Sequence, residues 1–176
     1  TGCTDEVLYY LAYEYEQATN YDKAREVYLE LIDKAPKSPY IPNAYLAFGE
    51  LFFQEAQGDP SKWDLAAAAY KEVIKYPPPN NKVYGYARYK LGYVHWNKGD
   101  YASALNEFKK VIEYGDGFSE LPNAKQLAKA ARRDLIPVKF TPRQNPFYIA
   151  LPYNDKAREG HRPEARTVAV VLEVFR

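Results

Sequence analysis

Residues 11–36 read LAYEYEQATNYDKAREVYLELIDKAP and contain the pattern from which the fold can be predicted. A small residue, Ala12, precedes a second small residue, Ala24, by twelve positions, and Tyr28 follows Ala24 by four. Apolar and aromatic residues three or four positions apart lie on one face of a helix. Pro36 then ends the pattern, because proline cannot continue a helix. The segment therefore predicts two amphipathic helices joined by a short turn.

The same order of residues occurs twice more along the chain. Gly49 and Ala66 take the small positions of the second copy, where inserted residues 57–61 lengthen the turn, and Gly92 and Ala104 take them in the third. Small residues at matching positions predict that paired helices cross closely there. The large residues that follow at matching positions are Tyr28, Leu31 and Ile32, then Tyr70, Val73 and Ile74, then Phe108, Val111 and Ile112.

Polar residues and prolines predict where these helices begin and end. Asp100 follows Gly99 and is expected to cap the second helix of the third copy, and Ser61 with Asp64 is expected to cap that of the second. Pro36 and residues 77–79, three consecutive prolines, end the second helices of the first two copies.

The pattern resembles the tetratricopeptide repeat, a helix-turn-helix unit of about 34 residues. The resemblance covers residues 5–117, as three repeats at about 5–36, 43–78 and 86–117. It implies an all-α solenoid in which the first helix of each repeat lines a concave face. The tryptophan usual in the first helix is replaced in the three copies by Leu8, Tyr45 and Arg88.

The remaining residues are expected to cap the solenoid and then to change character. Residues 118–136 place apolar side chains on one face of a helix and basic ones elsewhere, which predicts a capping helix. Residues 137–176 are rich in proline and contain two short apolar runs, at 147–151 and 167–175. This tail is predicted to be a β-hairpin or partly ordered arm, with a truncated second domain and a disordered extension as alternatives.

Composition excludes several classes of protein. The chain has 176 residues and a formal net charge of +1, which gives no broad basic face for nucleic acid. No apolar run approaches the length of a membrane-spanning helix. Cys3 is the only cysteine, which excludes an intrachain disulfide and a zinc site built from cysteines.

The inventory of catalytic groups is poor. His95 occupies the position held by Tyr15 and Phe52 in the other copies and is interpreted as a packing residue, and His161 lies in a turn that we expect to be solvated. No metalloprotease, serine hydrolase or phosphate-loop motif is present. We therefore expect no enzymatic activity, cofactor, metal or small-molecule substrate.

The resemblance also implies which side chains face a ligand in the concave groove. These carried-over positions are Tyr9, Tyr13, Glu16, Gln17, Asn43, Leu46, Glu50, Phe53, Gln54, Tyr86, Tyr89, Tyr93, Trp96 and Asn97. One equivalent position is an amide in all three copies, namely Gln17, Gln54 and Asn97, and an amide can both donate to and accept from a peptide backbone. The alternative is that the tyrosines only pack between repeats and the amides are solvated. Groove positions carry no Lys or Arg clamp for a partner's C-terminal carboxylate.

Tyrosine is unusually frequent, with 18 residues, and the repeat divides several of these into two sets. Packing positions are expected for Tyr15, Tyr21, Tyr28, Tyr70 and Tyr101. Recognition positions are expected for Tyr9, Tyr13, Tyr86, Tyr89 and Tyr93.

A narrower resemblance concerns residues 36–114. The segments at 38–45, 58–63 and 90–93 resemble tetratricopeptide lipoproteins of Gram-negative envelopes, of the myxobacterial gliding-motility and outer-membrane-assembly type. This implies a periplasmic scaffold that recruits other envelope proteins, with a cytoplasmic location as the alternative. Thr1-Gly2-Cys3 resembles the end of a lipobox, so Cys3 is interpreted either as a lipidated residue, anchoring the chain to the outer membrane, or as an incidental thiol.

The sequence thus predicts a protein–protein interaction scaffold that binds an extended peptide or a partner helix in the concave groove. Two alternatives stay open. The chain is a structural spacer or oligomerisation module, or it is a fragment of a larger protein whose activity lies elsewhere.

Overall fold

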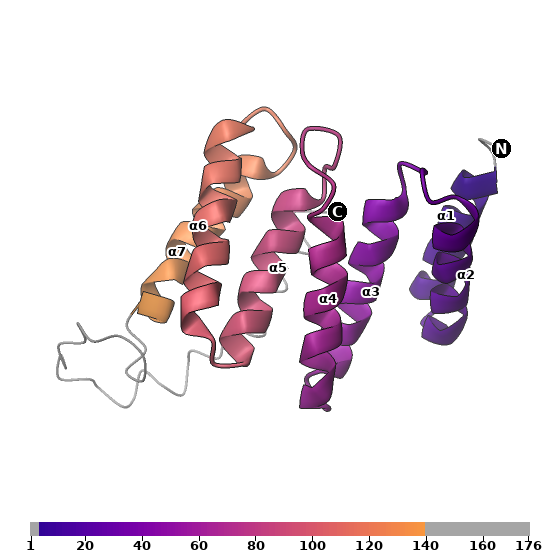
Figure 1. Cartoon of the computed structure of the whole chain (residues 1–176), viewed down its shortest axis with the longest axis horizontal. Helices are drawn as coiled ribbons and strands as arrows, with labels where there is room; N and C mark the ends of the chain where they lie inside the picture. The colour runs from indigo at the N-terminus through magenta and orange to yellow at the C-terminus, as the bar shows by residue number, and fades with distance from the viewer. Residues whose placement is uncertain (1–3, 140–176) are drawn as a thin grey trace.

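The computed structural model describes residues 4–139, with side chains through residue 135. Over this range all regular structure is helical, as the sequence predicts (Figure 1). The elements are α1 (Thr4–Gln17), α2 (Tyr21–Lys34), α3 (Ile41–Glu55), the single 3₁₀ turn η1 (Pro60–Lys62), α4 (Trp63–Val73), α5 (Tyr84–Asn97), α6 (Tyr101–Gly117) and α7 (Ala124–Lys139). The predictions for Cys3 and for a hairpin within residues 140–176 lie outside the described residues.

Consecutive helices pair side by side and the pairs stack into a solenoid (Figure 1). The pairs are α1 with α2, α3 with α4, and α5 with α6, and α7 then packs against α6. Among the odd-numbered helices, α5 contacts both α3 and α7, whereas contacts between even-numbered helices are few or absent in the described part of the chain. Helices α3, α5 and α7 therefore lie side by side, and Asn43 of α3 forms a hydrogen bond with Tyr9 of α1. We call the side of the stack formed by α1, α3 and α5 its inner face.

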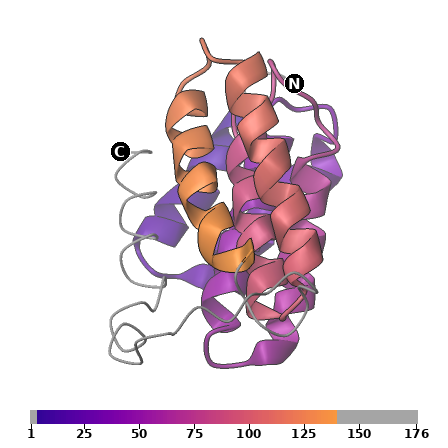
Figure 2. The ribbon, with the colours of Figure 1, turned by 90° about the vertical axis from the view of Figure 1, so that its left-hand side faces the viewer.

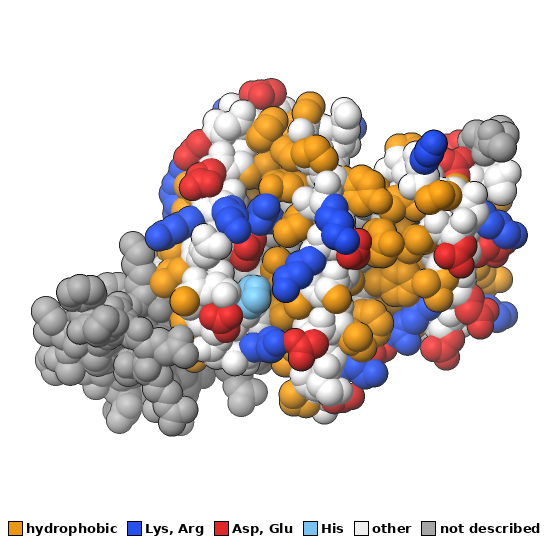
Figure 3. All heavy atoms as spheres, viewed as in Figure 1, with side chains coloured by type: hydrophobic (Ala, Val, Ile, Leu, Met, Phe, Trp, Pro, Cys, Tyr) orange, Lys and Arg blue, Asp and Glu red, His pale blue; other side chains and the backbone are white. Residues whose placement is uncertain are grey.

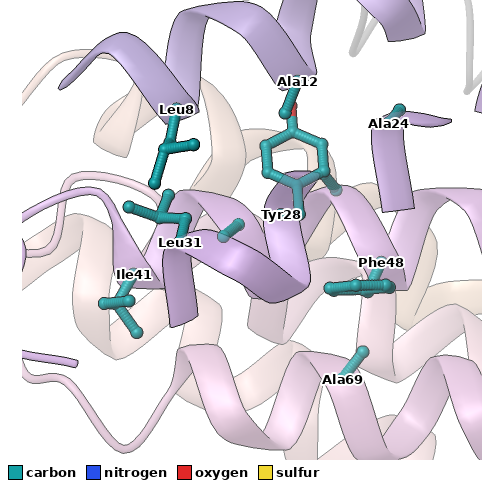
Figure 4. Packing of buried hydrophobic residues seen from close by; sticks show 10 residues of the cluster. Leu8, Ala12, Ala24, Tyr28, Leu31, Ile41, Phe48 and Ala69 are labelled. Atoms are coloured by element: carbon teal, nitrogen blue, oxygen red, sulfur yellow. The ribbon is translucent and has the colours of Figure 1, made fainter. Parts of the chain in front are cut away.

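Small residues let the helices of each pair approach closely, as predicted. A Cβ atom built on Gly49 would lie 2.5 Å from the ring of Tyr70, and one built on Gly92 would lie 2.7 Å from the ring of Phe108. Ala12 of the first pair is fully buried. Figure 4 shows the corresponding contact, with the ring of Tyr28 between Ala12 and Phe48. The aromatic residue of each second helix thus fills the space that the small residue leaves open.

The structure confirms only some of the capping residues predicted for the second helices. Asp100 caps α6, since its side-chain oxygen accepts a hydrogen bond from the backbone N–H of Ser103 at 3.1 Å. The prediction that Ser61 and Asp64 cap the second helix of copy two is wrong. The 3₁₀ turn η1 precedes α4, and Asp59 caps that turn by accepting from the backbone N–H of Ser61 at 3.0 Å. Lys62, the residue before α4, forms no capping hydrogen bond through its side chain. Asn20 caps α2, which the sequence pattern did not predict.

The helix α7 closes the C-terminal end of the described stack (Figure 2). It begins at Ala124, later than the pattern suggests, because Asn123 has a φ of 64° that no right-handed helix contains. It continues to Lys139, past Pro137. Ala124, Leu127 and Ala131 join the core built by α5 and α6. One face of α7 is therefore buried, as expected for a capping helix.

The outer side of the stack is seen in Figure 3, where charged side chains lie over α4 and α6 and apolar ones gather between α2 and α4. None of the helices in residues 4–139 is both long and apolar enough to cross a bilayer.

Candidate functional site

The inner face is the surface formed by α1, α3 and α5, and it carries most of the accessible residues that the sequence assigns to a groove. Tyr13 is 42% exposed. The amides Gln17, Gln54 and Asn97 are all exposed, at or next to the last residue of α1, α3 and α5 respectively. Equivalent ends of successive helices therefore present one amide each. Asn97 donates from Nδ2 to the backbone carbonyl of Tyr93 at 2.8 Å, which fixes the orientation of its amide.

Two half-buried carboxylates belong to the same face, and each accepts a hydrogen bond from a buried tyrosine of the paired helix. Glu16 accepts from the hydroxyl of Tyr28 at 3.0 Å. Glu50 accepts from the hydroxyl of Tyr70 at 2.5 Å and from that of Tyr86 at 3.2 Å. Burial of a hydroxyl without a partner is costly, so these carboxylates help to keep the tyrosine positions of the first two repeats stable.

The third repeat shows why the carboxylates are there. Its aromatic residue at the position of Tyr28 and Tyr70 is Phe108, which has no hydroxyl to satisfy. The residue at the position of Glu16 is correspondingly Trp96, whose ring packs edge-on against Phe108 with centroids 6.5 Å apart. In the second repeat the position of Glu16 is Phe53, and the acceptor for Tyr70 comes from another position of the first helix, that of Glu50.

The first helices of the first two repeats are acidic as a whole, and two of their carboxylates, Glu16 and Glu50, belong to the inner face. Helices α1 and α3 contain six Asp or Glu residues and no Lys or Arg. Lys90 of α5 lies 3.3 Å from Glu50 and its Nζ atom lies 3.5 Å from the ring centroid of Phe53. Among the described residues no cation lies within salt-bridge distance of Glu16.

The electrostatic consequence appears in the titration of Glu16. Burial raises the pKa of this carboxyl, the hydrogen bond from Tyr28 opposes the shift, and the negative charge of Glu50 adds to it. A cation brought next to Glu16 would favour its charged form.

Three of the predicted ligand-facing side chains are buried, which corrects the prediction for Phe53, Tyr86 and Tyr89. Tyr89 is 1% exposed, and its hydroxyl donates to Asp134 of α7 at 2.5 Å. The hydroxyl of Tyr93, which is half-buried, also lies 2.5 Å from Asp134. The physical reason is contact with neighbouring first helices: Lys90 of α5 lies over Phe53, Tyr86 donates to Glu50 of α3, and α7 covers Tyr89.

The remaining predicted residues are half-buried and link neighbouring helices. Tyr9 stacks on Tyr40 with ring centroids 4.7 Å apart, and Asn43 donates to the hydroxyl of Tyr9 at 3.2 Å. Tyr93 and Trp96 stack with their rings 3° from parallel, at the outer limit of the inner face on α5. Leu46 packs against the core of the second and third repeats.

The division of the tyrosines is therefore correct only in part. Tyr28 and Tyr70 are fully buried packing residues, as expected. Tyr15 and Tyr101 are half-buried, whereas Tyr21 is largely exposed and does not pack as predicted.

Asp134 is a buried acidic residue beside the candidate site that the repeat pattern did not indicate. It is buried, and it is the acceptor for two tyrosine hydroxyls of α5. The available signal was its isolation, since it is the one acidic residue among five basic ones in α7.

Catalytic and metal-binding groups are sparse in the described part of the chain. His95 is half-buried at the repeat position that Tyr15 and Phe52 occupy in the other copies. Burial lowers the pKa of His95, and the carboxylate of Asp100, 3.6 Å away, opposes this shift. Within residues 4–135 no three His, Cys, Asp or Glu side chains are grouped so that they could hold a metal ion.

Comparison with known families agrees with the repeat pattern. Residues 6–38 and residues 54–118 match two family models, each described as tetratricopeptide repeat. Together these segments cover more than half of the 176 residues. No curated protein matches the chain.

Proposed function

Because this chain belongs to the tetratricopeptide repeat family, we propose that it is a non-catalytic interaction protein whose inner face binds a segment of a partner protein, either extended or helical. The repeats of this family generally mediate contacts between proteins. The accessible Tyr13 and the exposed amides Gln17, Gln54 and Asn97 support this role, since they offer rigid contact area and paired donors and acceptors.

The bound segment carries Lys or Arg where it crosses α1 and α3. One observation supports this choice above all: Glu16 is half-buried beside Glu50, with a raised pKa and no cation near it among the described residues. A charged ammonium or guanidinium group of the ligand would lower the free energy of the ionised Glu16 and form a hydrogen bond of the strong, charge-assisted kind.

The cellular setting that we propose is a bacterial envelope or motility complex in the periplasm. Support comes from the resemblance of residues 36–114 to envelope lipoproteins and from the lipobox-like Thr1-Gly2-Cys3. Fractionation of cells that express the full-length gene, with mass spectrometry of the N-terminal peptide, tests this setting. Recovery in the membrane fraction with an acylated Cys3 supports it, and recovery of an unmodified cytoplasmic chain contradicts it.

The binding proposal is tested with an immobilised array of short peptides whose numbers of basic, acidic and neutral residues vary independently. The full chain is applied, and the best peptides are then measured in solution by fluorescence anisotropy. We expect selection of peptides that combine basic residues with apolar ones, and weaker binding at higher salt.

Variants assign the binding to the inner face. Tyr13→Ala and Glu16→Gln are each expected to weaken the best peptide about tenfold, which corresponds to about 1.4 kcal/mol. Tyr21→Ala is the matched control, because Tyr21 is similarly exposed but lies on α2. Equal loss in Tyr21→Ala, or unchanged affinity in Tyr13→Ala and Glu16→Gln, would refute the assignment to the inner face. A chain that selects acidic peptides would contradict the chemistry proposed for the ligand.

A further inference from the structure

The first helix exposes an unusual apolar surface at the N-terminal end of the described stack. Val7 is 62% exposed, Tyr10 is 52% exposed and Leu11 is 42% exposed. With the exposed Glu14, these residues occupy positions i, i+3, i+4 and i+7 of α1 and therefore lie on one face of it. We call these four residues the α1 stripe.

The other repeats bury the equivalent positions. The residues that correspond to the α1 stripe are Ala44, Ala47, Phe48 and Leu51 in α3, and Ala87, Lys90, Leu91 and Val94 in α5. All eight have exposures of 9% or less. The repeat architecture thus uses this face of a first helix for packing, and α1 presents it uncovered within the described residues.

Inside the stack, the second helix of the preceding repeat covers these positions, and its buried residues follow one pattern. Ala24, Tyr28 and Leu31 of α2 share a core with Ala44, Ala47 and Phe48, part of which is shown in Figure 4. In the next repeat, Ala66, Tyr70 and Val73 of α4 share a core with Ala87, Leu91 and Val94. Both covering helices therefore present a small, an aromatic and an aliphatic residue at positions i, i+4 and i+7.

The charge around the α1 stripe restricts the partner further. Residues 4–34 contain eight acidic and three basic side chains, and Glu6 and Glu14 beside the apolar residues are exposed. Like charges brought together destabilise a contact, so the surface favours a partner helix with basic flanks. Two copies of α1 would oppose each other for the same reason, because α1 has four acidic residues and no Lys or Arg.

Within residues 4–135, a second copy also offers no accessible helix face that matches. The small, aromatic and aliphatic residues of α6 are Ala104, Phe108 and Val111, which are fully buried in the core that α7 completes. Among the described side chains of α7, which end at residue 135, the exposed ones are polar: Lys125, Gln126, Lys129, Arg132 and Arg133. Such a surface could neutralise Glu6 and Glu14 but offers little apolar area to Val7, Tyr10 and Leu11.

We propose that the α1 stripe is a docking surface for an amphipathic helix of a partner protein. That helix carries a small, an aromatic and an aliphatic residue at i, i+4 and i+7 and has basic flanks. This surface is distinct from the inner face, so the chain has two separate recognition surfaces.

The proposal is tested with a synthetic peptide of residues 61–76, SKWDLAAAAYKEVIKY, which contains α4 and has a net charge of +1 with blocked termini. The peptide is labelled and titrated with the full chain, and binding is followed by fluorescence anisotropy. We expect saturable binding that weakens at least tenfold in Leu11→Lys and in Val7→Lys. Both side chains are largely exposed, so we expect these variants to fold, and circular dichroism checks this.

Matched controls locate the contact. Leu29→Lys makes the same substitution at a leucine that is 50% exposed on α2, outside the α1 stripe, and is expected to leave binding unchanged. The same peptide with Tyr70→Lys is expected to lose binding. Tyr13→Ala, which tests the inner face, is expected to retain this peptide, so failure of one surface is distinguishable from failure of the other.

A second measurement does not depend on the helicity of a free peptide. Residues 60–83 are grafted directly before Thr4, which reproduces the natural connection from α4 to Tyr84. We expect the graft to raise the melting temperature of the chain, and Leu11→Lys to remove that increase while Leu29→Lys keeps it.

Two results would overturn the proposal. The first is no binding of the peptide together with no stabilisation by the graft. The second is sedimentation of the full chain as an oligomer that both Leu11→Lys and Arg132→Glu dissociate, since the occupant of the α1 stripe would then be the basic end of a second copy.

Discussion

Buried tyrosine hydroxyls set the placement of acidic residues in this protein. The hydroxyl of Tyr28 donates a hydrogen bond to Glu16, those of Tyr70 and Tyr86 both donate to Glu50, and that of Tyr89 donates to Asp134. An unpaired buried hydroxyl costs about 1–3 kcal/mol, so each pairing removes a substantial penalty. The carboxylates themselves lose hydration on folding. For Glu16 this burial raises the pKa of the carboxyl group.

Neutralising Glu16 is therefore expected to stabilise the unliganded protein. A carboxyl whose pKa is higher in the folded than in the unfolded state reduces stability as the pH rises through the folded value. Glu16→Gln removes that loss and keeps an oxygen for Tyr28, so we expect a more stable protein at pH 7. Urea unfolding at several pH values measures this, and the gain should shrink as the pH approaches about 4.3, where an unfolded glutamate is half protonated. A Glu16→Gln protein less stable than wild type at pH 7 would contradict this account.

Removing Asp134 is expected to be costly, because two tyrosine hydroxyls lose their acceptor. We expect Asp134→Ala to lower the free energy of unfolding by about 2–4 kcal/mol. Asp116→Ala is the matched control, since Asp116 forms an exposed pair with Arg132, worth at most about 1 kcal/mol. If Asp134→Ala lowered the free energy of unfolding by as little as Asp116→Ala does, the hydrogen bonds of Asp134 would contribute no more than an exposed ion pair.

At the scale of the helices, close crossing depends on residues without a Cβ atom. Gly92→Ala would place a methyl group 2.7 Å from the ring of Phe108, so we expect a net loss of about 1–2 kcal/mol despite the better helix propensity of alanine. Gly117→Ala is the control, because a Cβ atom there would have nothing within 4 Å and the expected change is zero or slightly favourable. Thermal or urea unfolding of both variants measures these changes in stability. A Gly92→Ala protein as stable as the wild type would show that the crossing of α5 and α6 is not tight.

The same contacts show which features of the helices could be predicted from the sequence and which could not. The crossings at Ala12, Gly49 and Gly92 were predictable, because small and aromatic residues recur at fixed spacing within each copy. The burial of Tyr86 and Tyr89 was not predictable, since Tyr86 donates to Glu50, 36 residues away in the preceding repeat, and Tyr89 donates to Asp134, 45 residues away in α7. Spacing within one repeat contains no information about what the following repeat covers.

The capping of α4 illustrates a second limit. A serine followed three residues later by an acidic residue is a typical capping pattern, and Ser61 with Asp64 fits it. Asp59 instead caps the 3₁₀ turn η1, where its side chain accepts from both the backbone N–H and the hydroxyl of Ser61, and α4 itself has no side-chain cap. A tight turn that depends on local geometry thus replaces the pattern read from the sequence.

At the scale of the whole molecule, charge is distributed unevenly along the stack. Residues 4–34 are strongly acidic, whereas α7 has five basic residues and one acidic residue. The net charge of +1 conceals this difference. The uneven distribution favours basic partners near α1 and α3, and both proposed surfaces lie in that part of the molecule.

Removal of residues 140–176 is expected to leave binding to the inner face unchanged. All contacts described for α1, α3 and α5 are formed within residues 4–139. A chain that ends after Lys139 should therefore bind the selected basic peptide within about twofold of the full chain, as measured by fluorescence anisotropy. A loss of more than about tenfold would place the binding residues in the removed segment.

The central claim is that the inner face binds a basic segment of a partner, and hydrogen exchange with and without the best basic peptide tests it most directly. We expect the peptide to increase protection in α1 and α3, around Tyr13, Gln17 and Gln54, and Glu16→Gln to reduce this increase. Protection that is confined to α2, α4 and α6, or to residues 140–176, would contradict the account.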